Sequence, residues 1–485
     1  MLDLIQEAHL VKNIEDQNSG KIGNGLKRSL KSRHMLMISI GGTIGTGLFV
    51  GAGQVIHEAG PLGAVLAFVF GGLVMYLALL CLAELAVAIP VAGSFQVYAN
   101  IFISPAVGFT VGWMYWITWV ICIASNFTAS AIITHTWVPA IPVWQWCLIF
   151  IVFTGVINSI SVKVYGEMEF WFAGIKIIAI IAFIISGVGL MLGYFGHEGA
   201  IGFDNFSTDY GIFPNGYISL YFTLITVVFS FQGAELVGIA SGECENPEKN
   251  IPRVIKGVVF RIIIFYILAI VVLGATIPYQ QAGVLDSPFA YVFSRIGIPV
   301  AKIMMSVVVL TSALSASNSA LYVCSRMLWS MSNSGQAPVW LGKVSKSGVP
   351  FRGLVLSLLF TAISLLTSFY AADTVYLWLV SGVGMTGCIA WIVISWCQIN
   401  FRKKYVNEGG DIKKLIFKTP LYPFIPWLSI ILNILIIVSL AFMSDQRIVL
   451  YAGIPGVFII YSIYWLFFRK EKPLRNIVVS DGDIE

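Results

Sequence analysis

Charged residues are scarce in this 485-residue chain. Asp, Glu, Lys and Arg together make up 11% of it, whereas hydrophobic residues make up 58% and the mean hydropathy is +0.86. A soluble domain carries about a quarter charged residues, because its apolar core needs a polar surface. A soluble fold is therefore excluded, and the composition predicts an integral membrane protein.

The sequence also lacks the signatures of several other classes of protein. The net charge of +5 is small and is not gathered into one basic face, so no nucleic-acid partner is expected. The seven cysteines form no metal-ligand spacing and are expected to be reduced packing residues. No nucleophile and base, metal set or cofactor motif is found, which argues against an enzyme. The first 35 residues are polar, so no cleavable signal peptide is expected.

Long apolar runs take the place of these features. A bilayer core about 30 Å thick requires roughly 20 apolar residues per helix. Twelve runs of about that size predict an all-α fold with twelve transmembrane helices. The expected spans are 37–56, 63–88, 106–132, 145–163, 168–194, 214–240, 258–279, 299–331, 353–371, 375–398, 420–442 and 449–468.

Basic residues divide between the two sides of these spans. By this assignment 25 of the 29 Lys and Arg residues lie on the side that carries both termini, and the positive-inside rule makes that side cytoplasmic. The opposite loops are too short for an outer domain. The predicted parts are a tail (1–35), five spans (36–195), five more (196–400), a basic cytoplasmic loop (401–419), two further spans (420–468) and a cytoplasmic tail (469–485).

The first span contains a cluster of glycines, with six of them among the thirteen residues 41–53. Each weakens a helix by up to ~1 kcal/mol relative to alanine. Small residues also pack membrane helices together, but Thr43 and Thr46 lie inside the cluster and favour an interrupted helix. Unpaired backbone groups at membrane depth must line a cavity.

The sixth span is interrupted too, by Ser230, Gln232, Gly233 and Glu235. Polar groups at this depth are costly and usually functional. The two interruptions occupy corresponding places in spans 1–5 and 6–10, which indicates a secondary transporter built from inverted repeats. Helix ends exposed at such breaks offer N–H groups to a carboxylate and carbonyls to an ammonium, so an amino acid suits the site.

Several motifs resemble the bacterial amino acid permeases of the amino acid–polyamine–organocation superfamily. They cover roughly residues 25–470. The resemblance implies a LeuT-type fold of two inverted five-helix repeats plus two peripheral helices in a bacterial cytoplasmic membrane, and amino acid uptake driven by protons through alternating access. The motifs include Gly41–Phe49, Pro90–Phe95, Phe229–Leu236, Asn250–Arg253 and Ser325–Leu328.

Within this branch the nearest pattern is that of lysine-specific permeases, so lysine or another cationic amino acid is the expected substrate. Asn126 stands where that pattern has an acidic residue, and a cationic side chain favours a carboxylate partner. Neutral or aromatic amino acids therefore stay open as substrates, as does amino acid exchange. A nutrient sensor is the alternative from another class, and the oligomeric state is left open.

Individual residues receive expected roles from this reasoning. Lys176, buried in the fifth span, and Glu235 are expected to carry proton coupling. Ser315 and Ser319 share a helix face and are expected to line the cavity wall. The expected gate residues are Glu84, Phe231, Glu243 and Tyr376, and the expected substrate-binding residues are Thr43, Gly45, Thr46, Gly47, Asn126, Phe229, Ser230, Phe231, Gln232 and Glu235.

Overall fold

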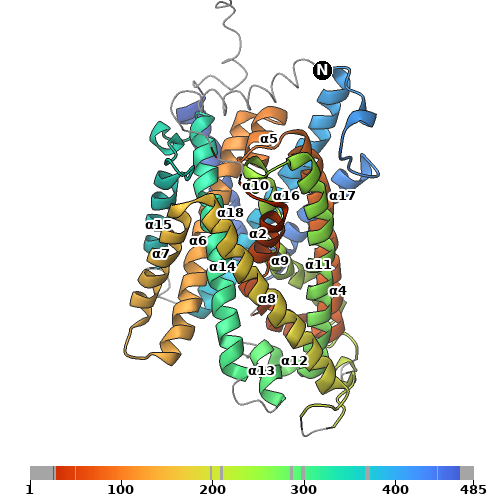
Figure 1. The fold of residues 1–485 in the computed structure, drawn as a ribbon. Coiled ribbons are helices and arrows are strands. Elements are labelled where there is room, and N and C mark those ends of the chain that lie inside the picture. Colours follow the sequence, from red (N-terminus) through yellow and green to blue (C-terminus); the bar gives the residue numbers. More distant parts are fainter. Residues whose placement is uncertain are drawn as a thin grey trace, which may run out of the picture.

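The structure is a computed structural model that describes residues 26, 29–49, 51–196, 199–207, 211–283, 288–296, 301–365, 372–444 and 446–469. These residues form helices and connecting loops (Figure 1). Their one β feature is a single parallel bridge between Leu30 and Cys244. The predicted all-helical fold is therefore confirmed.

Nine helical segments of the described chain have at least 18 residues and are apolar enough to cross a membrane. Each of the twelve expected spans coincides with one or more helices, although the number of crossings stays a prediction. The longer helices are α4 (Gly51–Ala88), α6 (Pro105–Trp137), α7 (Val143–Ile160), α8 (Val162–Met191), α9 (Tyr217–Phe231), α11 (Pro247–Thr276), α14 (Ala301–Asn333), α15 (Phe351–Leu365), α16 (Ala372–Asn407), α17 (Phe424–Ser439) and α18 (Arg447–Ile463).

Two of the expected spans are made from several helices. The first consists of α2 (Ser32–Thr43), α3 (Thr46–Phe49) and the beginning of α4, which turns at Gly60 with a φ of 75° before Pro61 starts the second span. The sixth consists of α9 and α10 (Leu236–Ala240). Both predicted interruptions therefore coincide with real helix ends.

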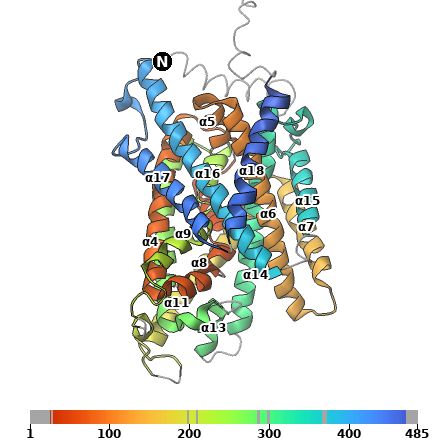
Figure 2. The same cartoon turned by 180° about the vertical axis from the view of Figure 1, so that it is seen from behind.

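The bundle has two distinct ends (Figure 1). One, here named the α5 end, carries the short helix α5 (Phe95–Phe102), and the other carries α12 (Tyr279–Ala282) and α13 (Pro288–Arg295). The interrupted helices α2 and α9 lie in the middle of the bundle. Helices α7 and α15 pack at one edge against α6 and α14, whereas α17 and α18 lie on the face toward the viewer in Figure 2, where α17 packs on α16 and α18 on α6.

The distribution of apolar side chains suits a lipid environment. Large apolar residues point outward, including Ile178 on α8 at 70% exposure and Phe458 on α18 at 65%. Polar residues such as Asn126, Asn158 and Asn318 are buried inside. Because lipid replaces water around the bundle, apolar residues can cover the outside while polar groups pair with one another within.

Candidate functional site

The first helix break begins at Ile44, where the backbone leaves helical geometry with a ψ of 96°. Lys176 lies opposite this break on α8 and is fully buried. Its ammonium nitrogen lies 2.6 Å from the carbonyl oxygen of Gly41 and 2.7 Å from that of Ile44. A cation from another helix thus hydrogen-bonds to carbonyls at the break.

The second break begins where α9 ends. Gln232 is extended, and Gly233 has a φ of 100°, in the region that favours glycine. A Cβ atom at Gly233 would overlap the carbonyl of Gly42, so the two breaks touch through their backbones. A side chain at Gly47 would likewise collide with Ser230. Glycine is therefore required because two interrupted helices approach each other closely.

Tyr266 on α11 braces both breaks. Its hydroxyl oxygen lies 2.9 Å from the carbonyl oxygen of Thr43 and 2.9 Å from that of Ser230. Its ring stacks on Phe231 with ring centroids 4.8 Å apart. One buried hydroxyl is therefore within hydrogen-bonding distance of a carbonyl at each break. This sharing matters because a buried carbonyl without a donor is costly.

A small cavity lies between the breaks, enclosed by residues of the two interrupted helices and of α6, α14 and α16. Six of the expected substrate residues line it. No acidic or basic side chain does so among the described residues. Its lining consists of Gly42, Thr43, Gly45, Gly47, Trp119, Cys122, Asn126, Phe229, Gln232, Ala316 and Val383.

Two of the lining polar groups are already engaged. The hydroxyl of Thr43 donates to the carbonyl of Ser39 at 2.6 Å, and the amide nitrogen of Gln232 donates to the carbonyl of Val383 at 2.5 Å. A Cβ atom at Gly387 would overlap the Gln232 amide, so this glycine makes room for it on α16. The Gln232 side chain is therefore held across the cavity wall.

Other expected substrate residues point elsewhere. Phe231 packs against Phe68 and Tyr266 on the side away from the cavity, and the hydroxyl of Ser230 donates to the carbonyl of Thr226 at 3.2 Å. Neither lines the cavity. The side chains of Thr46 and Tyr376 lie outside the described part of the structure.

Glu235 follows the second break and is fully buried without lining the cavity. Its carboxylate accepts hydrogen bonds from the Tyr115 hydroxyl at 2.7 Å, the Trp391 indole nitrogen at 3.3 Å and the backbone N–H of Gly233 at 3.2 Å. These donors come from α6, α16 and the break itself. They stabilise a buried carboxylate that would otherwise be costly.

Ser315 and Ser319 share a face of α14, but that face points to α8. Ser315 donates to the carboxylate of Glu169, and Ser319 accepts from the hydroxyl of Tyr165 at 3.4 Å. In the described structure Ala316 is the α14 residue that lines the cavity. The two serines therefore belong to a polar region beside Lys176.

Glu243 forms an ion pair near the α5 end. Its carboxylate lies 3.1 and 3.2 Å from two guanidinium nitrogens of Arg326 on α14 and also accepts from the Tyr322 hydroxyl. The backbone N–H of Leu30 donates to the Glu243 carbonyl at 3.0 Å. This arrangement ties the chain before α2 to the segment after α10.

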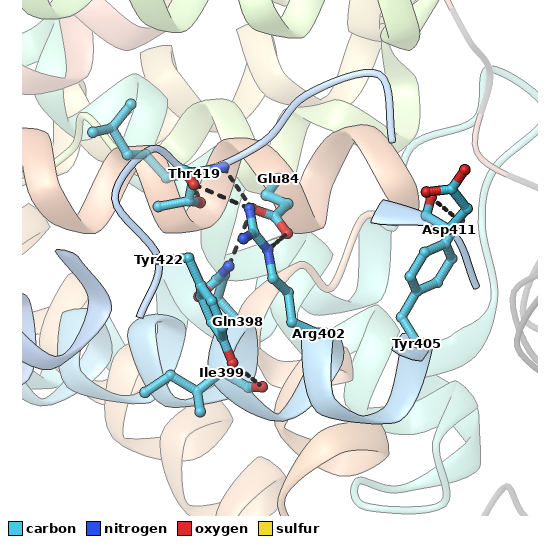
Figure 3. Close-up of polar contacts among 9 residues, drawn as sticks. Glu84, Gln398, Ile399, Arg402, Tyr405, Asp411, Thr419 and Tyr422 are labelled. Carbon is cyan, nitrogen blue, oxygen red and sulfur yellow. Dashed lines mark hydrogen bonds and ion pairs between the residues drawn. The ribbon is translucent and has the colours of Figure 1, made fainter. Parts of the chain in front are cut away.

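Glu84 forms a second buried ion pair close to the α5 end (Figure 3). Arg402 contacts its two carboxylate oxygens at 2.6 and 2.8 Å, Gln398 donates to it at 3.1 Å, and the backbone N–H of Thr419 donates at 2.6 Å. Glu84 therefore joins α4 to α16 and to the segment before α17. None of these contacts involves the segment after the second break.

Sequence reasoning missed several of these partners. Tyr266 resembles any aromatic residue of an apolar span, and the sequence marks Arg326 and Arg402 as motif residues on the basic cytoplasmic side without indicating their buried partners. Glu169 carried a usable signal, because a carboxylate seven residues before a buried lysine lies on the same face of a helix.

The fold and this central site define a multi-pass membrane protein with a small cavity between two interrupted helices. A model of the amino acid permease family matches residues 34–477, and the chain belongs to that family. Its members are transporters rather than enzymes, which supports amino acid transport as its general activity.

Individual relatives cover nearly the whole chain. The amino-acid permease RocE of Bacillus subtilis is 49% identical over 93% of this chain and 97% of its own length. The lysine-specific permease LysP of Lactococcus lactis is 40% identical over 96% and 95%. The gamma-aminobutyric acid permease of Bacillus subtilis is 41% identical over 93% and 95%. Relatives named for different substrates are thus about equally similar.

Proposed function

We propose that this protein imports an amino acid by proton symport with alternating access, in the cytoplasmic membrane of a bacterium and with both termini cytoplasmic. Its first ten spans form a LeuT-type inverted repeat of residues 36–195 and 196–400. The observation that carries the proposal is the meeting of two helix breaks at one cavity, with Lys176 hydrogen-bonded to carbonyls of the first break.

The substrate backbone binds between the breaks. Its carboxylate meets N–H groups of Thr46 and Gly47, where a new helix begins and the helix dipole favours negative charge. Its amino group meets carbonyls near Phe229 and Gln232, at the end of α9. Phe229, which lines the cavity, covers the bound molecule, whereas Phe231 packs behind it.

Lysine is the first candidate substrate, on the strength of the sequence resemblance and of the lysine-specific relatives. Its side-chain ammonium would rely on neutral acceptors such as Asn126. A neutral amino acid is the second candidate, favoured by one observation: no carboxylate lines the cavity within the described structure. A cation leaving water usually gains a carboxylate partner.

Coupling is assigned to Lys176 and Glu235. A protonated Lys176 holds the carbonyls of Gly41 and Ile44 together, and loss of that proton weakens both hydrogen bonds. Glu235 responds through its hydrogen bond to Gly233 at the second break. Proton binding is thereby linked to the geometry of both breaks.

The gate is assigned to charged pairs at the α5 end. Glu243 and Arg326 connect the segment after the second break to α14 and must separate for inward opening. Glu84 anchors α4 beside the gate through Arg402. Tyr376 completes the proposal as an aromatic gate residue, whereas Phe231 contributes to gating through its stacking on Tyr266, which contacts both breaks.

Uptake into proteoliposomes tests this function. Radiolabelled lysine and a radiolabelled neutral amino acid are offered separately, without sodium, under an inward proton gradient. Accumulation that collapses with a protonophore supports symport, and competition among unlabelled amino acids identifies the substrate. Uptake only into vesicles preloaded with amino acid would indicate exchange, and binding without uptake would indicate a sensor.

A further inference from the structure

A second buried charge lies close to Lys176. Glu169 is on the same helix, seven residues earlier and so about 10 Å nearer the α5 end at 1.5 Å per residue, and its side chain is fully buried. A carboxylate inside a membrane bundle is costly and calls for a specific function or partner. Neither the cavity lining nor the gate described above includes it.

Both oxygens of the Glu169 carboxylate are hydrogen-bonded. The hydroxyl of Ser315 donates to one oxygen, and the amide nitrogen of Asn318 donates to the other at 3.1 Å. The amide oxygen of Asn318 accepts in turn from Asn158 on α7 at 2.7 Å. All four side chains are buried, so the carboxylate sits in a built polar site between α7, α8 and α14.

Gly41 connects this site to Lys176. Its carbonyl accepts from the Lys176 ammonium, and a Cβ atom at Gly41 would overlap a carboxylate oxygen of Glu169. Both charged groups therefore touch the same residue at the first break. Their opposite charges compensate each other in a medium where a lone charge would be expensive.

Polar groups continue from Glu169 toward the α5 end. Tyr165, one turn earlier on α8, donates to Ser319 and stacks on Tyr322 with ring centroids 4.3 Å apart. Tyr322 donates to Glu243, the gate carboxylate. The titratable groups near Glu169 are thus Lys176 and Tyr165 on its own helix, whereas α2 contributes the backbone of Gly41 and α14 contributes three neutral side chains, Ser315, Asn318 and Ser319.

We propose that Glu169 receives the proton of Lys176 and releases it toward the cytoplasm. The inference rests on the proposed symport. A proton from outside first converts neutral Lys176 to its ammonium form. It then passes to the carboxylate, which leaves neutral lysine beside a carboxylic acid, and release of that proton to the inside restores the starting pair. One proton crosses in each cycle.

The test compares Glu169→Gln with Glu169→Asp and with Glu167→Gln in right-side-out membrane vesicles that accumulate substrate. Glu167 is two residues away on α8 and partly exposed, and it pairs with the exposed Arg33 and with the buried His34. We expect Glu169→Gln to lower proton-driven accumulation at least tenfold while exchange of internal for external substrate stays within about twofold of the unaltered protein. Glu169→Asp should restore part of the accumulation, and Glu167→Gln should retain it.

A pH profile separates proton release from a structural role. Acidifying the vesicle interior should slow net uptake by the unaltered protein, because release to the inside is opposed, but should not affect the residual uptake of Glu169→Gln. Normal accumulation by Glu169→Gln would overturn the inference. So would loss of exchange in both Glu169 variants. If the unaltered protein shows no proton-driven accumulation, the proposed symport itself fails, and the inference fails with it.

Discussion

Arg402 on α16 forms a bidentate ion pair with Glu84 on α4, in which two guanidinium nitrogens lie 2.6 and 2.8 Å from the two carboxylate oxygens. The pair is almost entirely buried, with side-chain exposures of 7% and 0%. The guanidinium also donates to the Thr419 carbonyl at 3.0 Å. Two spans and the segment before a third are therefore held at one point.

Breaking this pair should destabilise the protein without touching the cavity. Arg402→Gln leaves a buried carboxylate without its cation, which costs about 3–5 kcal/mol. Thermal unfolding of the purified protein in detergent measures the loss. Lys404→Gln is the control, because the Lys404–Glu408 pair is long at 3.9 Å and partly exposed and should contribute less than about 1 kcal/mol. Equal unfolding temperatures for the two variants would contradict the structural role.

The brace between the helix breaks makes a second prediction. Tyr266→Phe keeps the ring stacked on Phe231 but removes the hydroxyl shared by the carbonyls of Thr43 and Ser230. One buried carbonyl left unpaired costs about 1–3 kcal/mol. We expect the maximal uptake rate to fall about tenfold.

The control for this variant removes an equivalent bond at the periphery. Tyr221→Phe deletes a hydroxyl that donates to the Leu435 carbonyl between α9 and α17. Its uptake rate should change less than twofold. If both tyrosine variants lose activity equally, the special position of Tyr266 is refuted.

Two glycines of α16 allow a matched test of the cavity. Gly387→Ala forces the Gln232 amide from its place, whereas nothing lies within 4 Å of a Cβ atom at Gly382. We expect Gly387→Ala to raise the KM of uptake at least tenfold and Gly382→Ala to leave it within twofold. Kinetics of initial uptake in vesicles provide both values. An unchanged KM in Gly387→Ala would contradict the proposed role of Gln232 in substrate binding.

Much of the fold was predictable because it depends on one-dimensional patterns. Apolar runs located the helices, and glycines and polar residues inside those runs located both breaks, at Ile44 and at Gln232. The turn at Gly60 was predictable in position, since His57, Glu58 and Pro61 interrupt the apolar run around it. The expected first span ends at residue 56 and the second begins at residue 63, on either side of this turn.

The site was less predictable because its contacts join distant segments. Gln232 and Phe229 could be assigned to the cavity from their place at a break. The direction of Phe231 could not, since it depends on how α4 and α11 pack against α9. Arg402 indicated only the cytoplasmic side of the membrane in the sequence, because its buried partner Glu84 lies hundreds of residues away.

Removing the coupling charge should separate two kinds of transport. Lys176→Ala deletes the ammonium that bonds to Gly41 and Ile44. We expect concentrative uptake to fall at least tenfold, whereas exchange and substrate binding persist because the cavity lining is intact. Flux assays with and without internal substrate measure both. Normal gradient-driven uptake in this variant would show that Lys176 has no part in coupling.

Substrate-driven proton movement provides the sharpest test of proton symport. Proteoliposomes containing a pH-sensitive dye start with equal pH on both sides, and the transported amino acid is then added outside. We expect acidification of the interior that depends on substrate and is absent from Lys176→Ala. Amino acid entry without any acidification, measured in the same vesicles, would contradict proton symport.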